Sequence, residues 1–161
     1  MKNTGKSKKA LPKSYELADE HLDILAESAV AYGMMDNRGA YAAIGLVKHG
    51  VEFPVFKRVA KQSEFSLDDW AEILNISERT MQRYEQENKT FAPIYSEKIL
   101  AIDMLMRYGA DVFGSSNAFH VWLEANNVAL GGITPRTLLD TSFGIDLIRN
   151  ELCRIEFGVL A

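Results

Sequence analysis

The alternation of apolar and polar residues between Ser66 and Gln86 predicts two short helices joined by a tight turn. Ser66 is a good N-cap, and Asp69 stands where the acidic partner of a capping box is found, so the first helix is expected to begin at Leu67. Asn75 follows in the turn, where asparagine tolerates a left-handed backbone. The apolar positions of the first helix share one face at helical spacing: Leu67, Trp70, Ala71 and Leu74.

The second helix is expected to begin after Ser77, with Met81 and Tyr84 facing inward beside Ile76. Arginine can contact guanine or phosphate and glutamine can contact adenine, so a polar outer face of these residues suits a recognition helix in the major groove of DNA. A helical hairpin with a polar outer face also occurs in small α domains that bind no DNA. The residues expected at the DNA are Ser77, Arg79, Thr80, Gln82, Arg83, Gln86 and Lys89.

The segment before this hairpin is expected to hold a polar basic tail followed by helices. Residues 1–14 have no apolar periodicity and are either a disordered leader or a DNA-contacting arm. An irregular helical pattern covers 15–31, and turn residues fill 33–39. Two further helices are predicted at 42–48, ended by His49-Gly50, and at 51–62, where Pro54 suits a helix start and Phe56, Val59 and Ala60 face inward.

After the hairpin, 87–92 reads as a polar loop, and Pro93 opens a long helix expected to end at Gly109. Its apolar residues cover a wide arc of the helix surface, so the helix can be buried on more than one side. Such a helix can contribute both to the core and to a dimer interface. The apolar residues are Ile94, Ile99, Leu100, Ile102, Met104, Leu105 and Tyr108.

The last third of the chain differs in character. An apolar cluster at 119–123 contains Phe119, Val121, Trp122 and Leu123. It precedes a loop with Asn126, Asn127, Gly131 and Gly132. A short helix then runs from Thr134-Pro135 to Leu139. A final helix begins at Thr141 or Ser142, buries Ile145, Ile148, Leu152 and Ile155, and ends at Gly158. Six acids against three arginines give 110–161 a net charge of −3, which does not suit a nucleic-acid surface.

The predicted fold class is therefore all-α. We expect a helical DNA-binding domain over 15–108 with the helix-turn-helix at 66–86, followed by a small helical domain over 109–161.

Composition and charge refine this picture. The 161 residues are 47% hydrophobic and 25% charged, as in a globular protein with a real core. Cys153 is the only cysteine, so no internal disulfide forms, and we expect a buried, inert thiol. No apolar run approaches the roughly 18 residues of a membrane span and no signal peptide is visible, so we expect a cytoplasmic protein.

The net charge of −4 is unfavourable for phosphate contacts. Arg79, Arg83 and Lys89 stand where a duplex would lie, but Asp68, Asp69 and Glu72 precede them. We therefore expect affinity from a dimer, because two half-sites double the phosphate contacts. Further basic residues precede the first acid, Glu16: Lys2, Lys6, Lys8, Lys9 and Lys13.

Catalysis has little support in the sequence. His21, His49 and His120 are far apart and have no partner at metal-ligand spacing, so no metal site is expected. Cys153 lacks the signatures of a nucleophilic cysteine, and no glycine-rich nucleotide loop occurs. We expect no catalytic residue and no cofactor.

Residues 122–161 carry a specific pattern, WLEANNVALGGITPRTLLDTSFGIDLIRNELCRIEFGVLA, with the framework LGG-x-x-P-x-x-LL-x-T-x-x-G and a final L-x-RIE-x-G. This pattern resembles the MbcA/ParS/Xre antitoxin family, in which an Xre-like helix-turn-helix domain precedes a toxin-binding domain. The match over 50–108 is looser, and 1–40 lies outside it. Ala125 stands where the family would have proline.

The resemblance implies an antitoxin of a type II toxin-antitoxin operon, not an enzyme, that neutralises a RES-domain toxin which depletes NAD. It also implies repression of its own promoter, and a homodimer that forms larger complexes with the toxin. The residues expected to meet the toxin are Arg149, Arg154, Glu156, Gly158, Val159, Leu160 and Ala161.

Alternatives remain open at this point. Arg154 and Glu156 can form a solvated pair of no energetic weight, and Val159 and Leu160 can pack on their own domain. The protein can also be a DNA-binding regulator or a ParS-like factor whose C-terminal domain only oligomerises.

Overall fold

The computed structural model describes residues 37–158, and its regular elements are helices. The predicted basic tail, the helix at 15–31 and the tail residues Val159, Leu160 and Ala161 lie outside the described residues. The elements are α2 (Asn37–His49), α3 (Phe53–Ser63), α4 (Leu67–Ile73), α5 (Glu78–Glu87), α6 (Pro93–Phe113), α7 (Ser116–Glu124), the 3-10 turns η1 (Val128–Leu130) and η2 (Pro135–Leu138), and α8 (Ser142–Glu156).

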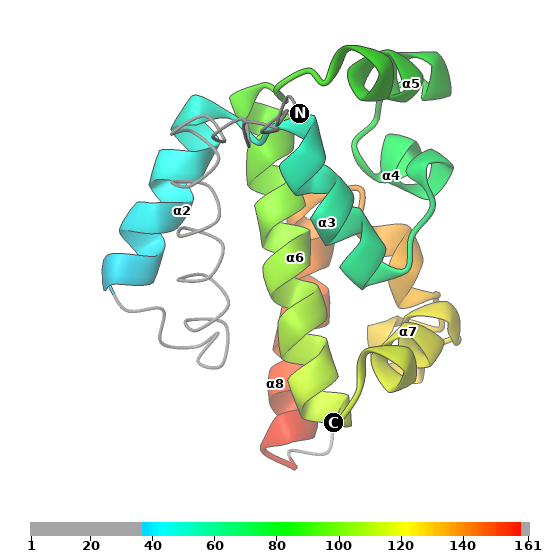
Figure 1. Cartoon of the computed structure of the whole chain (residues 1–161). Coiled ribbons are helices and arrows are strands. Elements are labelled where there is room, and N and C mark those ends of the chain that lie inside the picture. Colours follow the sequence, from blue (N-terminus) through cyan, green and yellow to red (C-terminus); the bar gives the residue numbers. More distant parts are fainter. Residues whose placement is uncertain (1–36, 159–161) are drawn as a thin grey trace, which may run out of the picture.

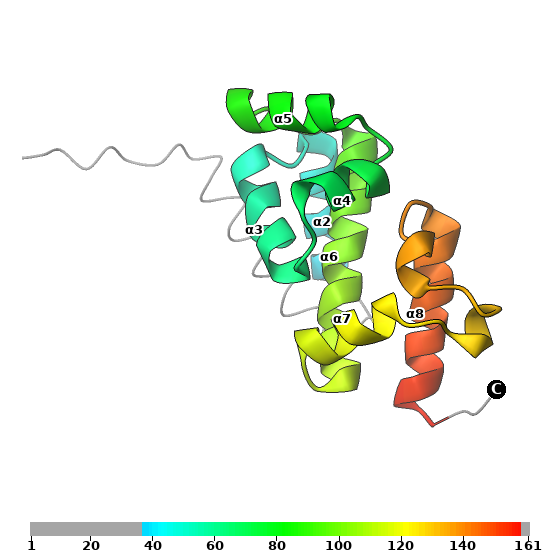
Figure 2. The same ribbon diagram turned by 90° about the vertical axis from the view of Figure 1, so that its right-hand side faces the viewer.

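Helix α6 is the axis of the molecule (Figure 1). Helices α2 and α3 pack against it, and α7 and α8 pack along its C-terminal half, while α4 and α5 lie toward its start (Figures 1 and 2). A helix that is apolar on nearly all sides is stable only when other elements cover it. The buried α6 residues Ile99, Ile102 and Leu105 therefore explain why helices from before and after α6 pack against it.

An aromatic cluster fixes the helix-turn-helix against α3 and the start of α6. Phe56 lies 5.2 Å from Trp70 in an edge-to-face arrangement and 4.9 Å from Phe91, measured between ring centroids. These rings are fully buried, and such pairs add about 0.5–1.5 kcal/mol beyond their area burial. Phe91 belongs to the segment predicted as a polar loop, so that prediction missed a core residue.

The prediction that the long helix ends at Gly109 is wrong. Helix α6 continues to Phe113 and ends at Gly114, whose φ of +78° is the left-handed conformation of a helix end. A Cβ atom at Gly109 would lie 2.3 Å from the Phe119 ring. Gly109 is thus a close-packing glycine that lets α7 approach α6.

Several smaller expectations are also corrected. Helix α2 begins at Asn37, so 37–39 are helical instead of a turn. Ile94 at the start of α6, Val121 on α7 and Ile155 on α8 are exposed, because each falls on the outer side of its helix. The Cys153 thiol is exposed, since it follows the buried Leu152 by one residue and is rotated off the buried face.

The other predicted helix boundaries lie within about two residues of those observed: α3 begins at Phe53 instead of Val51, and α8 ends at Glu156 instead of Gly158. Pro54 and Pro93 stand in the first turns of α3 and α6, Thr134 precedes η2, and Thr141 caps α8. In the part of the chain described, no helix is both long enough and apolar enough to cross a membrane.

Candidate functional site

Helices α4 and α5 form the predicted hairpin, and its caps are as expected. The Ser66 amide donates to Asp69 Oδ2 at 2.8 Å, and the Asp69 amide donates to Ser66 Oγ at 3.1 Å, which completes a capping box. Asn75 has a φ of +56° in the turn. The Thr80 amide donates to Ser77 Oγ at 3.1 Å and caps α5.

The inner face of α5 is anchored by Met81, which is buried, and by Tyr84, whose ring stacks on Phe91 with centroids 4.5 Å apart. The Phe53 amide donates to the Lys89 carbonyl at 3.1 Å just after the helix. The outer face of α5 therefore has a fixed direction.

The predicted DNA-contacting residues lie together on that outer face. Arg79, Gln82, Arg83 and Gln86 are exposed and line a shallow hollow of about 440 Å³ with Thr80 and Glu87. Ser77 lies at the start of α5, where its hydroxyl is 2.9 Å from that of Thr80.

Lys89 lies beyond the end of α5 and is already paired. Its Nζ is 2.6 Å from Glu87 Oε2, and the hydrogen bond from Lys89 lowers the pKa of Glu87. Lys89 therefore contributes less net positive charge to this surface than the sequence indicated. Arg79 and Arg83 carry most of the positive charge there.

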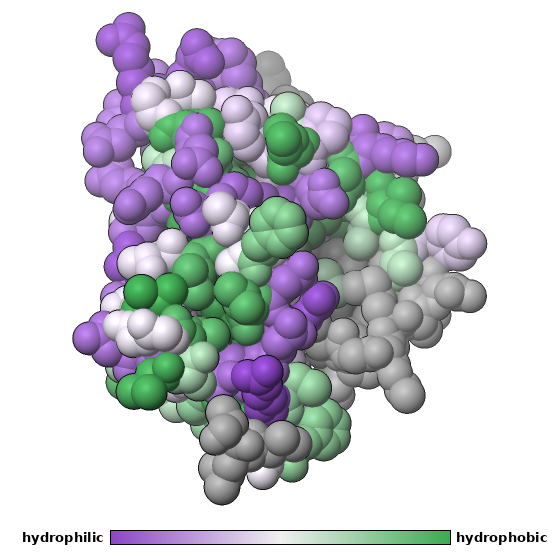
Figure 3. All heavy atoms as spheres, turned by 180° about the vertical axis from the view of Figure 1, so that it is seen from behind, coloured by the Kyte–Doolittle hydropathy of each residue, from purple (hydrophilic) through white to green (hydrophobic). Residues whose placement is uncertain are grey.

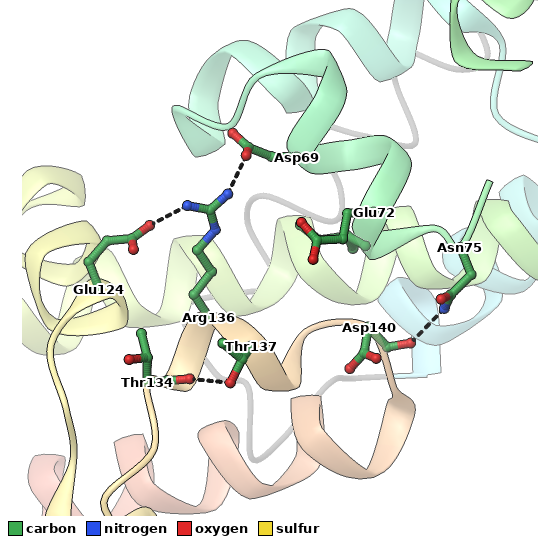
Figure 4. Close-up of a pocket in the computed structure, with 9 residues that line it drawn as sticks. Asp69, Glu72, Asn75, Glu124, Thr134, Arg136, Thr137 and Asp140 are labelled. Atoms are coloured by element: carbon green, nitrogen blue, oxygen red, sulfur yellow. Dashed lines mark hydrogen bonds and ion pairs between the residues drawn. The ribbon is translucent and has the colours of Figure 1, made fainter. Parts of the chain in front are cut away.

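Arg136, on η2, joins the helix-turn-helix to the C-terminal segment (Figure 4). Its Nη2 donates to Asp69 Oδ1 on α4, and its Nη1 donates to Glu124 Oε1 on α7 at 2.9 Å. The guanidinium also lies 5.5 Å from the centroid of the Phe65 ring. No local sequence signal predicts this contact, because the partners of Arg136 are distant along the chain.

These contacts shift the ionisation of both partners. Burial opposes the charged form of Asp69, but hydrogen bonds from Ser66 and the Arg136 charge outweigh it, so the pKa of Asp69 is lowered. Burial likewise opposes the charged form of Arg136, but Glu124 and Asp69 outweigh it and raise the pKa of Arg136. Both groups are charged near neutral pH.

A second polar junction lies at the other end of α4. The Asp140 carbonyl accepts hydrogen bonds from Lys98 Nζ at 2.6 Å and from Asn75 Nδ2 at 3.3 Å. Lys98 Nζ also donates to the Ile73 carbonyl at 3.1 Å. Partial burial lowers the pKa of Lys98, although the charge of Asp140 acts in the opposite direction.

The described members of the predicted toxin-contacting set, Arg149, Arg154, Glu156 and Gly158, lie on and just after α8, and the first three already have partners. Arg149 pairs with Asp146 at 2.8 Å, and Arg154 Nη1 lies 3.3 Å from Glu151 Oε2. Glu156 accepts a hydrogen bond from the Tyr108 hydroxyl at 2.5 Å.

Arg154 and Glu156 therefore bind different partners: Arg154 donates to Glu151, and Glu156 accepts from Tyr108. Gly158 follows the helix with a φ of +64°.

An exposed apolar patch in the C-terminal segment was not predicted. Phe143 and Leu147, one turn apart on α8, are 82% and 51% exposed, and Phe157 is 71% exposed just after the helix. Figure 3 shows the molecule from behind, the side on which α8 lies, with apolar side chains between polar ones. The spacing of four residues between Phe143 and Leu147, off the face of Ile145 and Ile148, is the signal that could have identified these two.

Metal chemistry has no support in the described part of the chain, where no three His, Cys, Asp or Glu side chains are grouped so as to hold a metal ion. His49 and His120 lie within that part, whereas His21 lies outside it.

Comparisons with known proteins match the two halves of the chain separately. Residues 42–102 match the family described as the antitoxin Xre-like helix-turn-helix domain, and residues 109–158 match the antitoxin Xre/MbcA/ParS C-terminal toxin-binding domain. Together these matches cover most of the chain. They divide it within α6, which runs without interruption through both.

Two curated relatives have similar lengths. A Prs ADP-ribosylating antitoxin from Sphingobium sp. (strain YBL2) is 26% identical over 140 residues, which span 81% of this chain and 88% of the relative. Antitoxin Xre from Photorhabdus laumondii is 25% identical over 117 residues, which span 72% and 79%. The chain therefore belongs to the Xre/MbcA/ParS antitoxin family of non-enzymatic proteins, and it combines an Xre-like helix-turn-helix domain with a C-terminal toxin-binding domain.

Proposed function

We propose that this antitoxin neutralises an NAD-depleting toxin of the RES class by direct binding and represses its own operon through the helix-turn-helix, in the cytoplasm. The observation that carries the proposal is that two unlike surfaces are exposed on separate elements. Exposed arginine and glutamine side chains lie on α5, and exposed apolar side chains lie on α8.

The DNA-binding part is supported by the outer face of α5. Its inner face is fixed by Met81 and Tyr84, so the side chains of Arg79, Gln82 and Arg83 project from a rigid helix. Such preorganised arginine and glutamine side chains can read base edges in the major groove. One subunit offers few phosphate contacts, so we expect a homodimer that binds two half-sites.

The toxin-binding part is supported by Phe143, Leu147 and Phe157. Large exposed apolar side chains gathered on one surface commonly mark a protein interface. Arg149, Arg154 and Glu156 lie on the same helix and can form the polar rim of that interface. Gly158 and the tail of Val159, Leu160 and Ala161 would extend the contact beyond the helix.

The toxin's chemistry is proposed from the family and from one relative. The Sphingobium relative is named for ADP-ribosylation of Prs, a reaction that consumes NAD. A RES-class toxin also consumes NAD, so we expect the product of the gene beside this one to lower cellular NAD.

The test is co-expression of this chain with the product of the adjacent open reading frame. We expect growth and NAD content to be maintained with the wild-type chain and lost without it. A duplex from the region upstream of the operon should shift in a gel with the purified protein, and more strongly with the complex.

One other function uses the same apolar face. If the C-terminal domain only oligomerises, the apolar face of α8 would bind a second copy and the protein would be a DNA-binding regulator or a ParS-like factor. Substitution of Phe143 and Leu147 would then reduce the solution mass of the chain on its own and leave toxicity unaffected.

A further inference from the structure

The orientation of the proposed recognition helix depends in part on α4. Helix α5 packs against α4, and it is also held by the buried Met81, by the stack of Tyr84 on Phe91 and by the hydrogen bond from the Phe53 amide to the Lys89 carbonyl. A change in the direction of α4 would therefore move the outer face of α5 as well. The groups that hold α4 in place matter for DNA binding even where they lie far from the DNA.

The first turn of α4 is held by Arg136 from the toxin-binding domain. Asp69 uses Oδ2 for its own capping box and Oδ1 for Arg136, so the two roles do not compete. Arg136 is itself held by Glu124 and by the face of the Phe65 ring. It therefore cannot move freely with Asp69 when α4 shifts. An Arg held by two carboxylates and a ring defines a direction as well as a distance.

The last turn of α4 is held by the backbone that leads into α8. Lys98 joins the Ile73 carbonyl to the Asp140 carbonyl, and Asn75 donates to that same Asp140 oxygen. Asp140 directly precedes Thr141, which caps α8. The turn of the helix-turn-helix and the start of α8 therefore share one hydrogen-bond acceptor.

Between these two junctions lies a cleft of about 580 Å³, lined by polar side chains that include Glu72, Thr134 and Thr137 (Figure 4). Apolar packing therefore does not fill this space between α4 and η2. The inner face of α4 is secured by Trp70, Ala71 and Leu74, which are buried independently of Arg136. Arg136 is thus not needed to form α4, but it restricts how α4 lies against the toxin-binding domain.

We propose that Arg136 is a positioning residue for DNA binding, which holds α4 and thereby α5 in the orientation that fits the major groove. The inference rests on the proposed DNA-binding function of α5. It assigns to the toxin-binding domain a part in DNA binding without any contact with DNA. Arg136 and Asp140 connect the two domains directly, so the same contacts link the start of α8 to the DNA-reading helix.

The test compares DNA affinity across four variants of the full chain. The probe is a duplex from the region upstream of its own gene, at one fixed salt concentration because affinity for DNA depends on salt. Arg136→Gln removes the cation, and Arg136→Lys keeps the charge but offers one ammonium for two carboxylates. Lys61→Gln, at an exposed site on α3, controls for charge. Ile148→Val, in the core of α8, controls for general destabilisation.

We expect Arg136→Gln to weaken DNA binding about three- to tenfold, with Arg136→Lys between it and wild type and both controls close to wild type. Amide hydrogen exchange across α4 and α5 should be faster in Arg136→Gln, while exchange in α6 is unchanged. If Arg136→Gln does not fold, Arg136→Lys carries the test, and unchanged affinity in that folded variant overturns the proposal.

The outcomes separate the inference from the function on which it rests. Equal affinity of wild type and Arg136→Gln overturns the inference and leaves the DNA-binding function standing. An equal loss in Arg136→Gln and Ile148→Val also overturns it, because the cause would be general destabilisation. A wild-type protein that does not bind the duplex overturns the DNA-binding function and the inference together.

Discussion

The guanidinium of Arg136 donates to the carboxylate of Asp69, which at the same time accepts a hydrogen bond in the capping box of α4. A residue of the toxin-binding domain thus completes the environment of the first helix of the DNA-binding hairpin. The contact also changes the electrostatics of the DNA side, because Arg136 compensates one of the acids that precede the recognition helix.

The recognition face gives the first prediction. Replacing Arg79 and Arg83 with alanine should weaken binding to the upstream duplex by about 1–3 kcal/mol for each bidentate base contact that is lost. Titration by fluorescence anisotropy measures the change, and Lys61→Ala is the control for loss of charge elsewhere. Unchanged affinity in the double variant would move the recognition surface away from α5.

The apolar patch on α8 gives the second prediction. Phe143→Ser together with Leu147→Ser should reduce affinity for the co-expressed toxin about tenfold or more, because large central apolar contacts carry much of an interface's energy. Val121→Ser removes an equally exposed apolar side chain from α7 and should leave affinity unchanged. Isothermal titration or pull-down with the toxin distinguishes these cases. Full binding by the α8 variant would exclude this face as the docking surface.

The tail gives the third prediction. Deleting Val159, Leu160 and Ala161 should release toxicity on co-expression while the helical content of the protein stays unchanged. Circular dichroism verifies the fold, and colony counts with NAD content measure protection. Complete protection by the truncated chain would show that the inhibitory contact lies before Gly158.

Gly109 gives the fourth prediction, on stability alone. A methyl group there would meet the Phe119 ring, so Gly109→Ala should lower the free energy of unfolding by about 1–3 kcal/mol in spite of alanine's better helix propensity. Urea unfolding measures it. If Gly109→Ala is as stable as wild type, α7 does not pack on α6 as described.

The lowered pKa of Asp69 gives the fifth prediction. Its ionised form contributes stability above the ordinary Asp value of 3.8, and that contribution is lost as the pH falls through the lower pKa of the folded state. The stability difference between wild type and Asp69→Asn should therefore shrink as the pH falls from 6 toward 3. A difference that stays constant over this range would mean that the Asp69 charge has no part in stability.

The hairpin could be predicted from the sequence because its signals are local. The capping box at Ser66 and Asp69 and the left-handed Asn75 each depend on neighbours within a few residues. Gly109 was misinterpreted because a helix-ending glycine and a close-packing glycine look alike until the position of Phe119 is known. Arg136 could not be assigned because its partner Asp69 is 67 residues away.

The site was predicted unevenly for the same reason. The outer face of α5 follows from helical spacing alone, and its residues are exposed as expected. On α8 the family resemblance drew attention to charged residues, although Glu156 is bound by Tyr108 and Arg154 by Glu151. The Tyr108–Glu156 contact depends on how α6 and α8 pack, which no local pattern contains. The Glu151–Arg154 pair lies within α8, three residues apart.

We propose that one chain binds both a toxin and the operator of its own operon. The most direct test of this proposal is purification of the complex formed with the product of the adjacent gene, followed by a titration of the upstream duplex with that complex. We predict a stable complex that binds the duplex and in which the toxin no longer depletes NAD. A chain that binds the duplex but neither captures that product nor prevents NAD loss would contradict the account.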